Sequence, residues 1–172
     1  MPQAERRYLR LVLVAGLTVV IDQLSKAIIQ EALPLAQTVQ VIPGLFSITH
    51  IRNTGGAFGL LAGRASTFRT VFFLGVSGLS VVILCYLYAG MAPGNRWAST
   101  ALCLICGGAL GNLVDRVRLG EVVDFLDFYV GPYHWPAFNL ADCAISVGVA
   151  ILVLHLLWGK SELSHRPLKK KE

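Results

Sequence analysis

Charged residues are scarce in this chain. Of its 172 residues, 15 are lysine or arginine and 10 are aspartate or glutamate, so only 15% are charged while 55% are hydrophobic. A soluble domain of this length has nearer one quarter charged residues and could not bury so much apolar surface. The scarcity therefore excludes an ordinary soluble domain and indicates that much of the chain lies in a lipid bilayer.

A basic face on a folded domain is also missing. The formal net charge is +5, but the basic residues gather near the two ends of the sequence. Proteins that bind nucleic acid carry lysines and arginines together on one folded face, so nucleic acid is not expected as a partner. A basic tail beside an apolar helix is suited instead to anionic phospholipid.

Metal-binding patterns are lacking too. The four cysteines, Cys85, Cys103, Cys106 and Cys143, all lie within apolar segments. Cys103 and Cys106 have metal-ligand spacing, but no second cysteine pair or histidine pair accompanies them. We interpret them as packing residues and expect no metal, no cofactor and no disulfide framework.

Four apolar segments approach the roughly 20 residues that a helix needs to cross the hydrocarbon core. They lie at residues 9–29, 68–89, 97–119 and 138–158. Basic residues precede the first segment, as in a signal peptide, but no small-x-small cleavage site follows, so we interpret it as a retained helix. With no domain boundary or repeat in sight, residues 1–172 are expected to form one integral membrane domain, mainly α-helical.

The connections at about 30–67 and 120–137 carry different patterns. Residues 38–42, 45–51 and 121–129 are β-leaning, and Pro43-Gly44 separates the first two runs. We expect a small amphipathic β platform there, together with a short interfacial segment at Ala57 to Ala62.

The basic residues set the expected orientation, because cytoplasmic loops are enriched in lysine and arginine. They precede the first segment, lie in the short loop between the second and third segments, and follow the fourth segment: Arg6, Arg7, Arg10, Arg96, Lys160, Arg166, Lys169, Lys170 and Lys171. Both termini are therefore expected in the cytoplasm. The polar residues of three segments then share one depth near the outer membrane face, where burying an acid costs less than at the helix centre.

Asp124 and Asp142 are the first candidates for chemistry. They are expected to meet at the outer mouth of the bundle, where two carboxyls in contact share a proton. One would then act as general base on water while the other, protonated, polarises a carbonyl. Spacing alone leaves open the alternative that each aspartate caps a helix or pairs with an arginine.

Two further clusters lie on helix faces. Asn112, Asp115 and Arg116 are three and four residues apart, so they share one face. Asn112 and Arg116 could bind substrate carbonyls while Asp115 orients Arg116 or another cation; a hydrogen-bonded helix end is the alternative. Asp22 and Lys26 are spaced as an i, i+4 ion pair, for which a structural role is favoured.

The remaining polar candidates are asparagines. Asn139 is either the N-cap of the fourth helix or a substrate contact, and Asn53 precedes Gly55-Gly56 in a turn. Three glycines are expected to let neighbouring helices approach closely: Gly107, Gly108 and Gly111.

At these residues the chain resembles the bacterial lipoprotein signal peptidases, also called signal peptidase II. Five motifs in order carry the resemblance over nearly the whole length: Asp22-Gln-Leu-Ser-Lys26, Asn53-Thr-Gly-Gly-Ala-Phe58, Gly107-Gly-Ala-Leu-Gly-Asn-Leu-Val-Asp-Arg116, Val122-Val-Asp-Phe125 and Pro136-Ala-Phe-Asn-Leu-Ala-Asp142. Many members of the family have alanine at the position of Gly56.

The resemblance implies an intramembrane aspartic peptidase of the bacterial inner membrane. Its substrates would be diacylglyceryl-modified prolipoproteins, cut just before the lipidated cysteine, and globomycin would inhibit it. The resemblance also implies that the protein is a monomer, that it uses no metal, and that it contacts membrane phospholipid. The implied roles are catalytic for Asp124 and Asp142, substrate-binding for Asn53, Asn112, Arg116 and Asn139, and supporting for Asp22, Lys26 and Asp115.

Two other classes remain as hypotheses. A proton- or ion-conducting protein could use the same acids as relays, but it needs polar residues through the full membrane depth, and the cytoplasmic halves offer only scattered Ser, Thr and Cys. A non-catalytic assembly subunit would tolerate Asp124→Asn and Asp142→Asn.

Overall fold

The computed structural model describes residues 3–55, 66–91 and 95–164. Its four helices are α1 (Gln3–Ala32), α2 (Ser66–Gly90), α3 (Arg96–Leu119) and α4 (Leu140–Ser164). Each contains a stretch long and apolar enough to cross a membrane: Glu5–Ala32, Thr67–Gly90, Arg96–Leu119 and Leu140–Leu157. The four predicted spans are therefore confirmed, and the chain is a multi-pass membrane protein.

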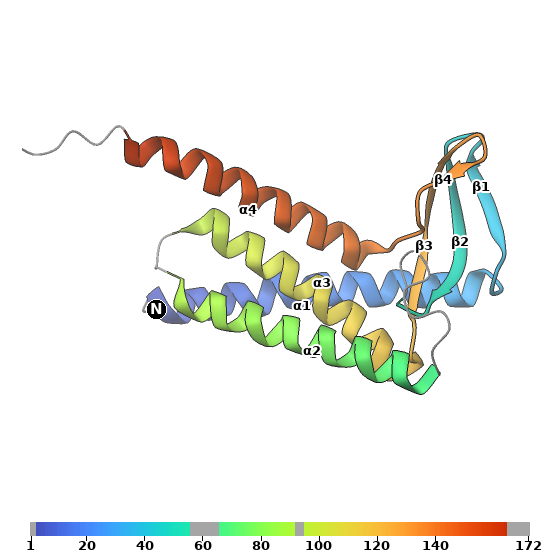
Figure 1. Cartoon of the computed structure of the whole chain (residues 1–172), viewed down its shortest axis with the longest axis horizontal. Helices are drawn as coiled ribbons and strands as arrows, with labels where there is room; N and C mark the ends of the chain where they lie inside the picture. Colours follow the sequence, from blue (N-terminus) through green and yellow to red (C-terminus); the bar gives the residue numbers. More distant parts are fainter. Residues whose placement is uncertain (1–2, 56–65, 92–94, 165–172) are drawn as a thin grey trace, which may run out of the picture.

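Helix α3 is the centre of the bundle. It packs against α1, α2 and α4, and its apolar stretch is the most buried of the four, whereas that of α2 has no buried residue. Figure 1 shows the N-terminal end of α1, the end of α2, the start of α3 and the end of α4 at one end of the bundle, with the sheet at the other. The exposed side chains of α2 are large and apolar, as lipid contact requires.

The predicted role of the α3 glycines is confirmed. A Cβ on Gly107 would lie 2.7 Å from Thr18 Cβ of α1, and one on Gly108 would meet the Ala141 carbonyl oxygen of α4. A Cβ on Gly111 would lie 2.5 Å from Asp22 Oδ2. Small residues here bring both α1 and α4 close against α3.

Gly108→Ala is expected to destabilise the protein by about 1–3 kcal/mol, because the added methyl group overpacks the contact between α3 and the first turn of α4. The methyl would also lie 2.7 Å from Ile145 Cγ1. Unfolding measured in detergent micelles tests this. Gly78→Ala is the matched control, since a Cβ there meets nothing within 4 Å; equal behaviour of the two variants would contradict the packing argument.

The strands form one antiparallel sheet in the order β1 (Thr38–Ile42), β2 (Phe46–Asn53), β3 (Val122–Val130) and β4 (Tyr133–His134). The three predicted β-leaning runs are confirmed within a few residues. Helix α3 ends at Leu119 and is capped by Gly120, whose φ of 74° allows the chain to turn directly into β3. This turn places Asp124 in a strand beside the end of α3.

The limits of α1 and α4 differ most from the predicted ones. Helix α1 extends from Gln3 to Ala32 rather than over 9–29, because polar residues at its ends continue the helix beyond the apolar run. Helix α4 begins at Leu140 rather than at 138, because Phe138 pairs with Leu126 of β3 and cannot be helical. The predicted interfacial segment at 57–62 lies outside the described residues.

Candidate active site

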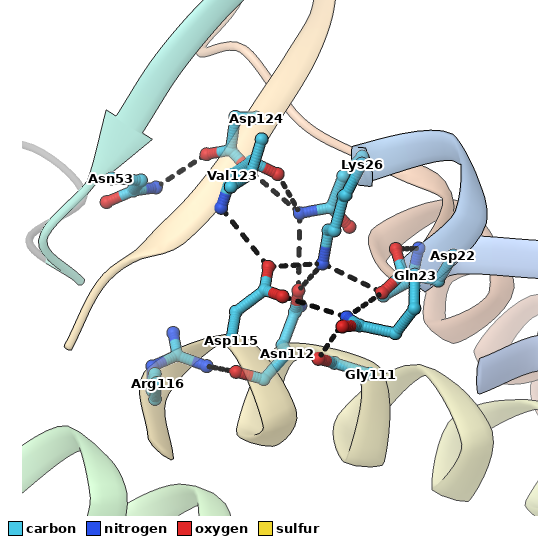
Figure 2. A network of polar contacts seen from close by, with 12 residues as sticks. Asp22, Gln23, Lys26, Asn53, Gly111, Asn112, Asp115, Arg116, Val123 and Asp124 are labelled. Carbon is cyan, nitrogen blue, oxygen red and sulfur yellow. Dashed lines mark hydrogen bonds and ion pairs between the residues drawn. The ribbon is translucent and has the colours of Figure 1, made fainter. Parts of the chain in front are cut away.

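Polar side chains from α1, α3 and β3 meet where the helix bundle joins the sheet (Figure 2), and Asn139, just before α4, donates hydrogen bonds to two of them. Burying so many polar groups is unfavourable unless each has a partner. Six of them are no more than 8% exposed: Asp22, Lys26, Asn112, Asp115, Asp124 and Asn139.

The ammonium group of Lys26 is the centre of the cluster. Its Nζ lies 2.8 Å from Asp22 Oδ2 and 2.8 Å from Asp115 Oδ2, and it donates to Asn112 Oδ1 at 3.0 Å. The predicted ion pair between Asp22 and Lys26 is thus confirmed. The cation that Asp115 orients is Lys26 and not Arg116, because Lys26 of the neighbouring helix reaches across the interface.

The two carboxylates that bind Lys26 also hold backbone. Asp22 Oδ1 accepts a hydrogen bond from the Ala141 N–H at 2.9 Å, and Asp115 Oδ2 accepts one from the Val123 N–H at 3.2 Å. Ala141 immediately precedes Asp142, and Val123 immediately precedes Asp124. Each ion-pair carboxylate therefore fixes the backbone beside one of the two candidate catalytic residues.

Gln23 belongs to this network, although no role was predicted for it. Its Nε2 donates to Asp115 Oδ1 at 2.8 Å and to the Gly111 carbonyl at 3.2 Å, and its Oε1 accepts from Arg118 at 3.2 Å. The sequence feature that could have indicated a role for Gln23 is its position beside Asp22 and on the same helix face as Lys26. The contact partners lie on another helix, so the sequence alone could not identify them.

Asn139 and Asp142 form a capping box at the start of α4. Asn139 Oδ1 accepts from the Asp142 N–H at 3.1 Å, and Asp142 Oδ2 accepts from the Asn139 N–H at 3.3 Å. The other oxygen of Asp142 accepts from Asn112 Nδ2 at 2.8 Å. The helix-cap alternative is therefore correct for both residues. Both also make contacts beyond the cap.

Asp124 is 2% exposed and held by two asparagines. Asn53 Nδ2 donates to its Oδ2 at 2.9 Å, and Asn139 Nδ2 donates to its Oδ1 at 2.7 Å. Burial raises the pKa of the Asp124 carboxyl to about 6; these hydrogen bonds oppose the rise and the charge of Asp142 adds to it. Asn139 thus bonds Asp124 through its side chain and Asp142 through its backbone.

Asn53 and Arg116 border the cluster. Asn53 Oδ1 accepts from the Gly55 N–H at 2.9 Å, so the predicted turn role is confirmed alongside the bond to Asp124. Arg116 donates to the Asn112 carbonyl at 3.3 Å, and its guanidinium lies 5.9 Å from the centre of the Phe73 ring. Among the described residues, Arg116 makes no ion pair with a carboxylate.

The arrangement has the elements of acid–base chemistry. Asp124 holds its proton more readily than an ordinary aspartate, and Asp142 is half-buried and within electrostatic reach of it. Two carboxyls whose environments differ can divide the roles of acid and base. In the part of the chain that the structure describes, neither has a lysine or arginine within ion-pair distance.

Comparisons with known proteins agree with one another. The family model described as signal peptidase (SPase) II matches residues 14–158. A lipoprotein signal peptidase of Desulforapulum autotrophicum is 48% identical over 155 residues, which cover 90% of this chain and 96% of that protein. One of Syntrophus aciditrophicus is 44% identical over 150 residues, covering 87% and 93%.

Solved structures show the same fold. A bacterial membrane enzyme determined by the in meso method at 2.3 Å resolution matches with a TM-score of 0.77 and 34% identity, over 94% of this chain and 93% of the other. A second, at 1.9 Å, has a TM-score of 0.75 and 36% identity, over 86% and 92%. With the family model covering most of its length and such relatives matched nearly end to end, the chain belongs to the signal peptidase II family.

Proposed function

We propose that this protein is a lipoprotein signal peptidase that uses Asp124 and Asp142 as an aspartic dyad. It cleaves diacylglyceryl-modified prolipoproteins immediately before the lipidated cysteine and releases the signal peptide. The observation that carries the proposal is Asn139, which bonds Asp124 at 2.7 Å and Asp142 at 3.3 Å and so holds two carboxyls without ion-pair partners in one site. The names of the relatives supply the substrate class.

The dyad divides the reaction into acid and base roles. Asp124, buried with a raised pKa, carries the proton and donates it to the scissile carbonyl oxygen. Asp142, half-buried at the start of α4, takes a proton from the attacking water. The tetrahedral intermediate then collapses as the C–N bond breaks, the leaving amine accepts the proton held by Asp142, and Asp124 recovers its own from the hydroxyl group.

The surrounding residues have separate tasks. Four side chains bind the substrate backbone near the scissile bond: Arg116, Asn53, Asn112 and Asn139. Asn112 and Asn139 also orient the two carboxyls, since both donate to them. Asp22, Lys26 and Asp115 support the site through the backbone that they hold.

The proposed setting is the inner membrane of a bacterium. Residues 1–172 act as one domain and as a monomer, with both termini in the cytoplasm and the sheet at the outer face in contact with phospholipid. The scissile bond of a lipidated substrate lies near that face, so the dyad reaches both the bond and external water. Globomycin is expected to inhibit the enzyme.

The direct test is cleavage of a purified prolipoprotein in detergent or vesicles. The wild-type protein should cut the diacylglyceryl-modified form before its cysteine and leave the unmodified form intact. Mass spectrometry of the two products locates the cut. Cleavage of both forms at equal rates would overturn the substrate assignment, and cleavage of neither would overturn the peptidase proposal.

The pH dependence follows from the proton on Asp124. As the pH rises through about 6, Asp124 loses this proton, both carboxyls are ionised and no acid remains to polarise the carbonyl. We expect kcat/KM to fall over this range. Asn53→Ala removes a hydrogen bond that lowers the pKa of Asp124, so the fall should move to higher pH; a move to lower pH would contradict this role for Asp124.

A further inference from the structure

The guanidinium of Arg116 is held only weakly by its own helix. Within the described residues it donates one hydrogen bond, to the Asn112 carbonyl at 3.3 Å, which is long for a charged donor. Figure 2 shows the side chain at the border of the polar network, with its one dashed line leading to Asn112. A long arginine side chain loses conformational entropy when a substrate fixes it. Any second contact that already holds the guanidinium therefore favours binding.

The second contact comes from α2. The centre of the Phe73 ring lies 5.9 Å from Arg116 Cζ, within the range over which the face of an aromatic ring attracts a cation. Helix α2 packs against α3, but it contributes none of the residues labelled in Figure 2. Phe73 is thus the side chain through which α2 meets the site.

The phenylalanines in the first turns of α2 face in different directions. Phe68 and Phe72 are 54% and 43% exposed, and their rings stack with centroids 6.3 Å apart, as on a lipid-facing surface. Phe73 is half-buried and meets the Phe72 ring edge to face at 5.3 Å. Of the three, Phe73 is the one turned towards α3, so Phe68 offers a matched control on the same helix.

The Phe73 ring is also packed against the turn that carries Asn53. A Cβ on Gly55 would lie 2.7 Å from Phe73 Cγ, and the φ of 95° at Gly55 would strain any other residue. The Gly55 N–H donates to Asn53 Oδ1 at 2.9 Å, and Asn53 in turn donates to Asp124. One ring therefore contacts Arg116 and the turn of Asn53, which are both proposed to bind substrate.

The position of Arg116 matters because of the charges nearby. The carboxyls of Asp142 and Asp124 are within electrostatic reach of its guanidinium. If Arg116 moved into an ion pair with either of them, the pair would favour the ionised carboxylate. The site would then lose the proton that polarises the scissile carbonyl. A contact that draws the guanidinium towards α2 opposes this movement.

We propose that Phe73 is a positioning residue for Arg116. Its ring holds the guanidinium at the border of the site, ready for a substrate carbonyl and apart from Asp124 and Asp142. This role rests on the proposed peptidase function, in which Arg116 binds the substrate backbone. The contact between the ring and the guanidinium does not rest on it.

Fluorinated phenylalanines at position 73 test the charge distribution of the ring at nearly constant shape. One, two or three fluorines withdraw electron density from the ring face and so weaken its attraction for a cation step by step. Phe68 receives the same series as the matched control. Each full-length protein is assayed on a diacylglyceryl-modified prolipoprotein over the acidic and neutral pH range.

We expect KM to rise with each fluorine at position 73, by about 3–10-fold for three fluorines, while kcat at the optimal pH stays within about twofold. The fall of kcat/KM should also move to lower pH, because a released guanidinium favours the ionised form of Asp124. The fluorines leave the other charges that act on Asp124, those of Asp142 and Lys26, in place. An unchanged KM and pH profile, or the same response at Phe68, would overturn the proposal.

A measurement without substrate separates this proposal from the peptidase proposal. Phe73→Leu and Arg116→Met are combined in a double-mutant cycle, and the unfolding equilibrium is measured in mixed micelles. The unfolding constant of the double variant should be about 3–10-fold smaller than the two single effects predict, because both changes remove the same contact. Independent effects would overturn the contact, whatever the cleavage assay shows. Coupling in a protein that cleaves no prolipoprotein would overturn the peptidase proposal and, with it, the substrate role of Phe73.

Discussion

Asp124→Asn and Asp142→Asn are each expected to lower kcat by about 10³-fold or more while the protein still inserts and folds. An amide can neither supply the proton to the carbonyl oxygen nor accept one from water, and positioned acid–base groups contribute about 10²–10⁴ each. Both side chains keep their size, and each loses only one of the two hydrogen bonds that its carboxyl accepts, because the new NH2 group cannot accept one. The measurement is single-turnover cleavage of a diacylglyceryl-modified prolipoprotein by purified variants.

Asp127→Asn is the matched control. Asp127 lies three residues from Asp124 in the same strand and is also buried, but it projects to the opposite face of the sheet and bonds His134 at 2.9 Å. Its replacement should leave kcat within about twofold, because Asp127 touches neither candidate catalytic carboxyl. Normal cleavage by either Asp124→Asn or Asp142→Asn would rule out the dyad and favour a non-catalytic role.

Lys26→Met is expected to destabilise the protein by about 3–5 kcal/mol, because removing one member of a buried ion pair leaves its partners uncompensated. Lys26 is 1% exposed and lies 2.8 Å from both Asp22 and Asp115. Those carboxylates hold the N–H groups of Ala141 and Val123, so the change also loosens the backbone beside both candidate catalytic residues. Reversible unfolding in mixed micelles gives the free energy, and cleavage gives the activity.

Two further variants separate the charge effect from packing. Adding Asp115→Asn to Lys26→Met removes one of the two orphaned charges, so the double variant should recover part of the loss, with a coupling of about 0.5–3 kcal/mol. Arg118→Met is the control cation: it is exposed and bonds Gln23 at 3.2 Å, so its loss should cost less than about 0.5 kcal/mol. If the stability effects of Lys26→Met and Asp115→Asn were strictly additive, the buried interaction between these two side chains would be contradicted.

Local patterns were sufficient for the architecture. A span needs about 20 consecutive apolar residues, so the four helices are readable from composition, and only their limits moved, at Phe138 for example. Strand alternation and the turn at Pro43-Gly44 predicted the sheet for the same reason. The Asp22–Lys26 pair was also predictable, because i and i+4 always meet on a helix.

Contacts between elements were decided only in three dimensions. Asp115 binds Lys26 rather than Arg116, Gln23 reaches Asp115 across 92 positions of sequence, and Asn139 serves both as a helix cap and as the link between Asp124 and Asp142. Periodicity shows which residues share a face of one element, but it contains nothing about which face another element meets. That depends on the close approach at the α3 glycines and on the turn at Gly120, which together bring α1, β3 and α4 to one point.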